Sequence, residues 1–300
     1  MIQNDDLFLK AYLEDRRNII EEALYRYLPE DGIPSDLYKA VRYSVFNGGK
    51  RIRPILCLAS AEAVGGDLAP AMPVACALEL IHTYSLIHDD LPSMDNDDFR
   101  RGKPTCHKVF GENMAILAGD ALLTEAFALL SRSEKVMFSA ERRLAVIQEI
   151  ADAAGINGMV GGQALDVISE KTGADEKTLL EIHRRKTGAL IVAAVRSGAV
   201  ILNAGKDKIQ SLTEYGINVG QAFQIADDIL NVEGDSALMG KGTGSDAARN
   251  KVTYPSLLGM QTAKEKLEQH IETAVASLSG FDERAMPLIL IARYVKERKS

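Results

Sequence analysis

The sequence predicts an all-α fold, a single large bundle of ten or more helices around a central cavity. Almost every segment carries apolar residues at helical spacing, and no stretch shows sustained two-residue alternation bounded by turn residues. No linker rich in proline, glycine or serine divides the chain, so we expect one domain over residues 1–300. With 46% hydrophobic residues but only 6% aromatic ones, its core should be mainly aliphatic.

Composition narrows the class of protein. The net charge of −7 argues against a nucleic-acid partner or an anionic membrane surface. The three cysteines have no CxxC spacing, which favours packed thiols in a reducing compartment. The acidic, amphipathic N-terminus does not resemble a signal peptide, and no uninterrupted apolar run is long enough to cross a bilayer. We therefore expect a cytoplasmic protein without a membrane span.

The helices can be placed from their apolar periodicity and their terminal residues. Asn47-Gly48-Gly49 is a strong helix stop, and Pro54 falls in the first turn of the next helix. Asp175 is expected to cap a helix that continues through Lys186 to Ile201. The remaining long helices are expected over residues 5–28, 35–46, 69–91, 112–131, 134–154, 208–233, 254–279 and 283–298.

Two glycine-rich stretches interrupt this pattern. The run 155–162 is too rich in glycine for an ordinary surface helix and indicates close packing or a bend. The loop 234–250 contains Lys241, and Lys251 follows it directly. Because it is glycine-rich, basic and adjacent to acidic residues, we interpret it as a lid, with a plain surface loop as the alternative.

An aspartate cluster follows the long apolar helix 69–91. Acidic clusters are usually solvated loops, but this one grows out of an apolar run and has Arg100 and Arg101 close behind. Asp89 and Asp95 are six residues apart, and a bend at Pro92 can bring them to one metal ion. Mg²⁺ prefers oxygen ligands and is typically held by one or two carboxylates plus substrate phosphates. The cluster therefore predicts a magnesium site for a phosphate-bearing substrate.

A second aspartate pair lies in the helix 208–233. Gln224, Asp228 and Asn231 share one helical face, and Asp227 lies beside it. Carboxylates are rarely left unpaired inside a core. Two such pairs facing each other across a bundle would be satisfied by several Mg²⁺ ions and a polyanion between them.

Basic residues supply a separate candidate anion site. Lys50 and Arg53 lie where a helix begins, and free N–H groups and the helix dipole attract phosphates there. His82 lies two turns before Asp89 on the same face, where it can donate to a phosphate. The plainer alternatives are a solvated turn for the basic residues and a hydrogen-bonded core histidine for His82. His88 and His107 are interpreted as structural.

The motifs together resemble those of the trans-isoprenyl diphosphate synthases, most closely the bacterial farnesyl diphosphate synthases. DDLPSMD and DDILN are similar to the two aspartate-rich motifs, and GGKRIRP (48–54) and GGQALD (161–166) follow the family order. The similarity runs roughly from Arg42 to Gly259. It implies the isoprenoid synthase fold, a homodimer, and head-to-tail condensation of isopentenyl diphosphate with dimethylallyl and geranyl diphosphate.

The resemblance also implies roles for individual residues. Diphosphate would leave the allylic substrate with the help of several Mg²⁺ ions, Mn²⁺ being the alternative, and would take up the released proton. The expected metal ligands are Asp89, Asp95 and Asp227, then Asp90 and Asp228. The allylic diphosphate site would comprise Arg100, Lys186, Thr187, Gln224, Lys241 and Lys251, of which Lys186, Thr187 and Gln224 are catalytic. Isopentenyl diphosphate would bind Lys50, Arg53, His82 and Arg101.

Product length is expected to depend on Tyr84 and Ser85. Tyr84 is the fifth residue before Asp89, about 7.5 Å down the helix. In the resembling family, an aromatic residue there goes with a short pocket and a farnesyl product, although packing alone also explains a tyrosine. The alternatives are a geranylgeranyl diphosphate synthase with a deeper pocket, a terpene cyclase, and a non-catalytic partner subunit of a prenyl synthase.

One departure from the family pattern yields a prediction. The second motif commonly ends in aspartate, whereas this chain has Asn231. Asparagine accepts a hydrogen bond from metal-bound water but adds no charge. We expect Asn231→Asp to strengthen the apparent Mg²⁺ affinity, measured from the Mg²⁺ dependence of activity. An unchanged affinity would refute this role.

Overall fold

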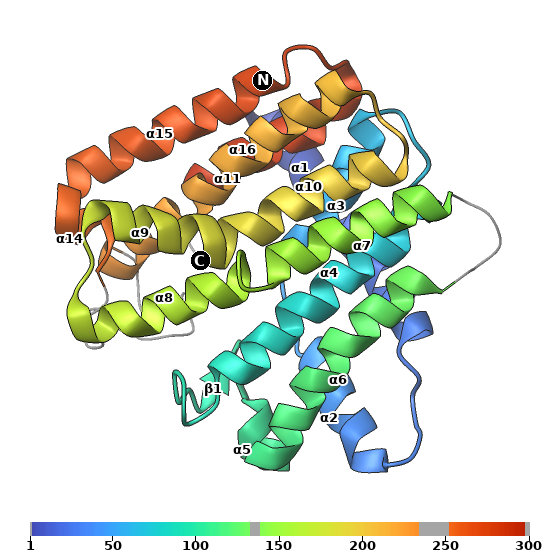
Figure 1. Ribbon diagram of the computed structural model, residues 1–300. Coiled ribbons are helices and arrows are strands. Elements are labelled where there is room, and N and C mark those ends of the chain that lie inside the picture. Colours follow the sequence, from blue (N-terminus) through green and yellow to red (C-terminus); the bar gives the residue numbers. More distant parts are fainter. Residues whose placement is uncertain (1, 133–138, 234–251, 298–300) are drawn as a thin grey trace.

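The computed structural model describes residues 2–132, 139–233 and 252–297, and it is built almost entirely of helices (Figure 1). The elements are α1 (Ile2–Tyr27), α2 (Ser35–Val45), α3 (Ile52–Ala63), α4 (Leu68–Asp89), β1 (Phe99–Arg100), β2 (Lys103–Pro104), α5 (Cys106–Phe110), α6 (Glu112–Ser131), α7 (Ala140–Ala154), α8 (Met159–Thr172), α9 (Glu176–Ile182), the π-helical segment η1 (His183–Gly188), α10 (Ala189–Ile201), α11 (Lys206–Glu233), α14 (Tyr254–Leu258), α15 (Met260–Ser277), the 3₁₀ turn η2 (Glu283–Ala285) and α16 (Met286–Glu297).

The predicted all-α class is confirmed, with local differences. The helix expected over 254–279 is divided, because Gly259 has φ +82° and caps both α14 and α15. A short antiparallel ribbon, β1–β2, and the helix α5 were not expected. Asp175 caps α9 as predicted, its side chain accepting a hydrogen bond from the Thr178 N–H at 2.8 Å.

The core is organised around two long helices. α4 packs against α3, α6 and α10, and most of its side chains are buried. α11 packs against α10, α15 and α16. Their carboxyl-terminal ends, which carry the two aspartate pairs, lie on the same side of the bundle, toward the left of Figure 1. The core is mainly aliphatic, as predicted; its fully buried residues include Ile55, Leu56, Leu78, Ile81 and Leu122.

Helices α3 and α10 are in close contact. A Cβ atom on Gly198 of α10 would lie 2.1 Å from the carbonyl oxygen of Cys57 in α3. Beside it, Ser60 Oγ donates a hydrogen bond to the Val195 carbonyl at 2.5 Å. All three cysteines are buried free thiols, as expected, and burial raises the pKa of the Cys57 and Cys76 thiols.

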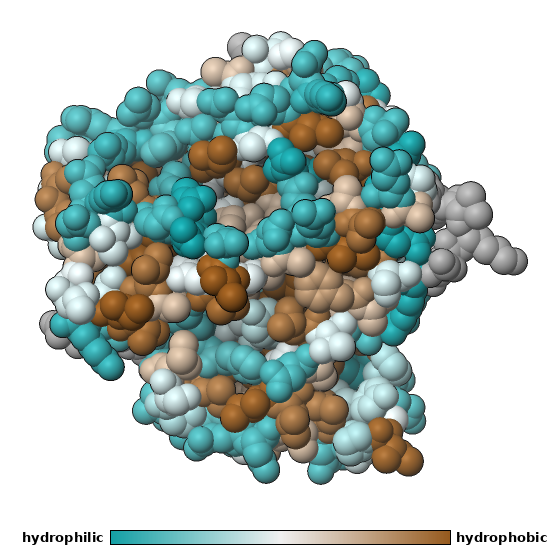
Figure 2. Space-filling view, in the orientation of Figure 1, coloured by the Kyte–Doolittle hydropathy of each residue, from teal (hydrophilic) through white to brown (hydrophobic). Residues whose placement is uncertain are grey.

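Apolar side chains also reach the surface. By length and composition alone α4 and α6 would pass as membrane-spanning helices, a test that core helices of soluble proteins pass too. The apolar part of α4 is 72% buried, whereas that of α6 is only 39% buried. Figure 2 shows brown apolar patches over α6 and α8. The exposed residues include Ile116 and Leu117 on α6 and Val160 and Ile168 on α8.

The α3–α10 contact predicts a specific sensitivity. Gly198→Ala should lower the unfolding free energy by about 1–3 kcal/mol, because the new methyl group forces the helices apart. Gly280→Ala is the matched control, since a Cβ atom there would meet nothing within 4 Å. Urea unfolding of both variants tests this, and equal effects would contradict it.

Candidate active site

The first aspartate pair ends α4, and the chain then folds back on it. The Asp95 N–H donates to the Asp89 carbonyl at 2.8 Å, and the Met94 N–H donates to the Leu91 carbonyl. Asn96, with φ 52°, completes the reversal. The bend predicted at Pro92 thus returns the backbone of Asp95 to that of Asp89. Both side chains are partly exposed.

Asp90, in contrast, is turned into the protein. It is 3% exposed, and Arg100 Nε lies 2.9 and 2.8 Å from its two carboxylate oxygens, with Nη2 at 2.5 Å from one of them. Burial alone would lower the pKa of Arg100, but the hydrogen bonds and charge of Asp90 raise it overall. Arg100 lies in the β1–β2 ribbon, where it pairs with Lys103. Arg101 and Gly102 form the turn of this ribbon and both have positive φ, as a tight two-residue hairpin requires.

The second pair, on α11, divides in the same way. Asp227 is exposed, whereas Asp228 is 4% exposed. One oxygen of Asp228 accepts a hydrogen bond from the Tyr254 N–H at 2.9 Å, and the other accepts from Gln224 Nε2 at 3.1 Å. In each pair, therefore, the first carboxylate is the more exposed, outward one, and the second is anchored by protein groups.

The π-helical segment η1 packs against α8 and α11, and its Lys186 is the largest charge that acts on Asp89. Lys186 Nζ donates to Asp166 Oδ2 of α8 at 2.6 Å, and Thr187 Oγ1 donates to Gln224 Oε1 of α11 at 2.9 Å. α8 can approach η1 closely because residue 162 is glycine: a Cβ atom there would lie 2.2 Å from the backbone nitrogen of Lys186. The close packing expected from the glycine run therefore serves to hold Lys186. Single-turn π segments occur frequently at functional sites.

Charges of both signs act on the pKa of Asp89. Burial raises its pKa above the usual 3.8, Asp95 and Asp90 raise it further, and Lys186 and Arg100 oppose them. A cation beside these carboxylates would relieve that repulsion, and their oxygen donors suit Mg²⁺. Among the described residues, no three histidine, cysteine or acidic side chains converge as a complete metal cage. A metal ion here would need further ligands from water or substrate.

Three of the predicted isopentenyl diphosphate residues, Arg53, His82 and Arg101, lie close together near the amino end of α3. The fourth, Lys50, is exposed and lines a groove with residues of α1 and α16. Arg101 donates to the Gly48 carbonyl, and a Cβ atom on Gly49 would lie 2.5 Å from the Arg101 guanidinium. Burial lowers the pKa of Arg53, while Glu79 and Asp227 oppose that shift. The pKa of His82 falls well below 6.5, first through burial and then through nearby arginines. His82 is therefore a neutral hydrogen-bonding group facing cations.

Not every predicted residue joins this site. Lys241 and Lys251 lie outside the described residues. Ser85 Oγ donates to the His82 carbonyl at 2.9 Å and so serves its own helix. Tyr84 is buried, and its ring meets that of His88 edge-on, with centroids 5.6 Å apart.

Two buried charged residues near the anion site were not predicted. Arg51 and Glu79 are each 2% exposed and are joined by a 2.6 Å ion pair. A sequence signal existed, because Glu79 is the only acidic or basic residue, histidine aside, between Leu68 and His88.

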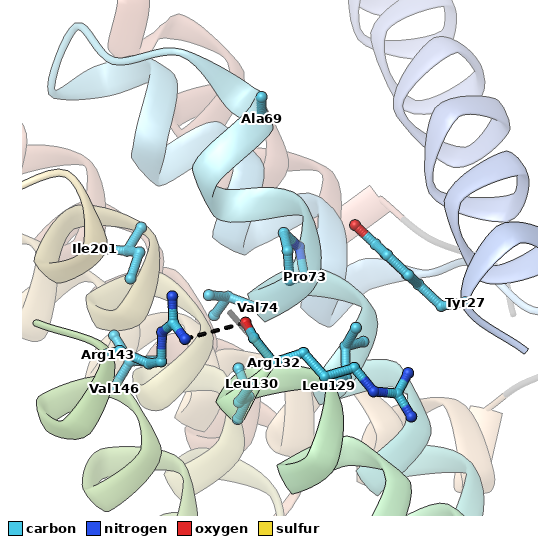
Figure 3. Close-up of a pocket in the computed structure, with 10 residues that line it drawn as sticks. All are labelled: Tyr27, Ala69, Pro73, Val74, Leu129, Leu130, Arg132, Arg143, Val146 and Ile201. Carbon is cyan, nitrogen blue, oxygen red and sulfur yellow. Dashed lines mark hydrogen bonds between the residues drawn. The ribbon is translucent and has the colours of Figure 1, made fainter. Parts of the chain in front are cut away.

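A small cavity lies at the other end of α4 (Figure 3). Its volume is about 80 Å³, and its lining includes Pro73 and Val74 of α4 with Leu130 of α6 and Val146 of α7. Arg143 Nη1 donates across its edge to the Arg132 carbonyl at 3.0 Å. Ala69 on its rim lies 20 residues before Asp89, about 30 Å by helical rise. This cavity is separate from the aspartate site.

Comparison with known proteins agrees with this geometry. A family model described as polyprenyl synthetase matches residues 34–285. A farnesyl diphosphate synthase of Geobacillus stearothermophilus is 49% identical over 97% of this chain and 98% of its own. A geranylgeranyl diphosphate synthase of Cyanophora paradoxa is 46% identical over 97% of each chain. The crystal structure of an FPP/GFPP synthase from Zymomonas mobilis superposes with TM-score 0.88 and 40% identity, covering 97% of this chain and 99% of that one.

The neutral state of His82 predicts a pH effect on stability. Its folded pKa is depressed, so between pH 6.5 and the lower folded value only the unfolded chain binds the proton, and stability falls as pH falls. From pH 7 to 5 the loss is at most about 2 kcal/mol, the limit for a histidine that has an unfolded pKa of 6.5 and stays neutral in the folded protein. Urea unfolding should show that His82→Gln loses less stability over this range than the wild type; equal losses would contradict the assignment.

Proposed function

This chain belongs to the polyprenyl synthetase family and is a prenyltransferase, and we propose that its product is farnesyl diphosphate. The proposed reaction is head-to-tail condensation of isopentenyl diphosphate first with dimethylallyl and then with geranyl diphosphate. The allylic diphosphate ionises, the isopentenyl double bond attacks the allylic cation, and a proton is lost.

One observation supports the proposal: the predicted diphosphate-binding residues fall into two groups whose charged surroundings differ. Asp89 lies close to Asp90 and Asp95, whose charges raise its pKa, so a diphosphate there would require metal ions. Around His82 the charges that lower its pKa come from arginines, Arg53 and Arg101 first, so a second diphosphate there would require no metal ion. A terpene cyclase, with one diphosphate substrate, would not need the second site. A non-catalytic subunit would not need the complete first one.

The outward carboxylates are the proposed metal ligands. Asp89, Asp95 and Asp227 would hold Mg²⁺, with Mn²⁺ as the alternative. When bound, Mg²⁺ would supply the electrostatic stabilisation that diphosphate needs as a leaving group. Asp90 and Asp228 would instead fix Arg100, Gln224 and the segment at Tyr254, given the hydrogen bonds that they accept.

The residues of η1 and α11 would act on the allylic substrate. Lys186, held by Asp166, would bind the diphosphate with Arg100, and Lys241 and Lys251 would add charge from the proposed lid. The Thr187 and Gln224 oxygens, joined by their hydrogen bond, would direct dipoles at the allylic cation. The surrounding aliphatic core would exclude water, which would otherwise quench that cation. No side-chain base is assigned; the released diphosphate would accept the proton.

The farnesyl and geranylgeranyl diphosphate synthases compared above are 49% and 46% identical to this chain, so we base product length on the pocket. The buried Tyr84 ring, held against His88, supports a short pocket and a farnesyl product. A geranylgeranyl diphosphate synthase with a deeper pocket is the second candidate.

We also propose a cytoplasmic homodimer of one-domain subunits. The apolar residues exposed on α6, among them Ile116 and Leu117, would be covered by a second copy. We do not propose that α4 crosses a membrane, because its apolar residues build the core. Sedimentation of the purified protein measures the mass: a monomer at micromolar concentration would contradict the dimer.

The test supplies isopentenyl diphosphate and Mg²⁺ with either dimethylallyl or geranyl diphosphate, and identifies the products by mass. Farnesyl diphosphate from both primers is expected. Longer products would keep the reaction and exclude the short pocket. The absence of any condensation product, with folded protein, would exclude the proposed activity.

Tyr84 gives a separate prediction. Tyr84→Ala should deepen the pocket and shift the main product toward geranylgeranyl diphosphate, because the buried ring is removed. Product mass measures this. Ser85→Ala, one residue further on, is the comparison. Unchanged product length in Tyr84→Ala would remove Tyr84 as the pocket floor.

A further inference from the structure

The amino end of α3 is held by a buried arginine in an unusual conformation. Arg51 precedes α3 with φ 52° and ψ 34°, the left-handed region that residues with a Cβ atom rarely adopt. Its carbonyl accepts the first helical hydrogen bond of α3, from the Ile55 N–H at 3.0 Å. Backbone strain of this kind persists only where the surroundings enforce it.

The Arg51 side chain shows what enforces it. Nη1 lies 2.6 Å from Glu79 Oε1 on α4, and Nη2 donates to the carbonyl of Val45, the last residue of α2, at 2.7 Å. Nε lies 3.6 Å from Glu21 of α1. One guanidinium thereby ties α1, α2 and α4 to the start of α3.

A buried ion pair does not by itself explain stability, because desolvation offsets much of its attraction and an apolar pair of similar size is often as stable. Such a pair can instead fix one geometry among several. Here the fixed residue lies between Lys50 and Arg53, the other two cations of the GGKRIRP motif.

Glu79 also influences the other cations of this group. It is the largest charge opposing the burial that lowers the pKa of both Arg53 and Arg101. On α4 it lies one turn before His82. A single buried carboxylate therefore lies among the residues proposed to bind isopentenyl diphosphate.

We propose that Arg51 and Glu79 are positioning residues of the isopentenyl diphosphate site. They do not contact the substrate: their ion pair holds the backbone at Arg51 so that Lys50 and Arg53 converge on one diphosphate. The inference rests on the proposed function. The pair acts on the isopentenyl site and not on the metal-dependent allylic site, whose proposed residues lie at the end of α4, on β1, in η1 and on α11.

The test compares two variants with a matched control. Glu79→Gln keeps size and an acceptor oxygen but removes the charge. Arg51→Lys keeps the charge but cannot bridge two acceptors in a fixed plane. The control, Glu62→Gln, removes a half-buried carboxylate near the other end of α3, where it pairs with Arg16 and Tyr12.

Steady-state kinetics measures the two substrates separately. In Glu79→Gln and Arg51→Lys the KM for isopentenyl diphosphate should rise about tenfold or more, equivalent to about 1.4 kcal/mol of binding free energy. The KM for geranyl diphosphate should change by less than about twofold. Glu62→Gln should lower the Tm and leave both KM values unchanged.

Two results would overturn the proposal. If the variants lower the Tm but leave both KM values unchanged, the pair is structural only. If both KM values rise equally, the pair supports the whole site. Should the wild type form no product, the proposed function fails instead, and titration calorimetry with isopentenyl diphosphate then decides. If Glu79→Gln binds isopentenyl diphosphate about tenfold more weakly than the wild type, the role of the pair is supported. If the two proteins bind it equally, or if the wild type does not bind it, that role is excluded.

Discussion

Compensation of buried charge is the constraint on which this structure depends. Two apolar helices, α4 and α11, carry aspartate pairs to the same end of an aliphatic bundle. An unpaired carboxylate in such surroundings is costly. In each pair one carboxylate is therefore anchored by the protein, Asp90 by Arg100 and Asp228 by Gln224 and the Tyr254 backbone. The anchoring leaves Asp89 and Asp227 oriented outward, where metal-bound diphosphate would complete the compensation.

The same constraint explains the loops around the site. The β1–β2 ribbon delivers Arg100 to Asp90, and the π-helical segment η1 delivers Lys186 to Asp166. Each irregular segment thus supplies a charge partner for a buried or half-buried carboxylate. The glycines at 49 and 162 allow the required close approach to Arg101 and Lys186.

Much of the fold was predictable because it rests on apolar periodicity. The helices and the stops at Gly48–Gly49 follow from local pattern. The division at Gly259 could have been inferred from that glycine, but the helical period continues on both sides and conceals it. The β1–β2 ribbon has two residues per strand, too few for any alternation to show.

The site was predictable in composition but not in orientation. The motifs identified Asp89, Asp95 and Asp227 as well as Asp90 and Asp228, yet periodicity does not reveal which of two adjacent carboxylates is buried. The Arg51–Glu79 ion pair could not be predicted from local pattern, because its two residues are 28 positions apart. A lone glutamate in an apolar helix signals a buried partner without identifying it.

The most direct test of this account counts bound metal in matched aspartate variants. Mn²⁺ bound in the presence of diphosphate would be counted by electron paramagnetic resonance for Asp89→Asn, Asp227→Asn, Asp90→Asn and Asp228→Asn, with the Tm of each. The outward variants should lose bound Mn²⁺ and keep their Tm. The anchored variants should keep the metal count and lose thermal stability. Loss of Mn²⁺ from Asp90→Asn and Asp228→Asn, to the same extent as from the outward pair, would contradict the division of roles.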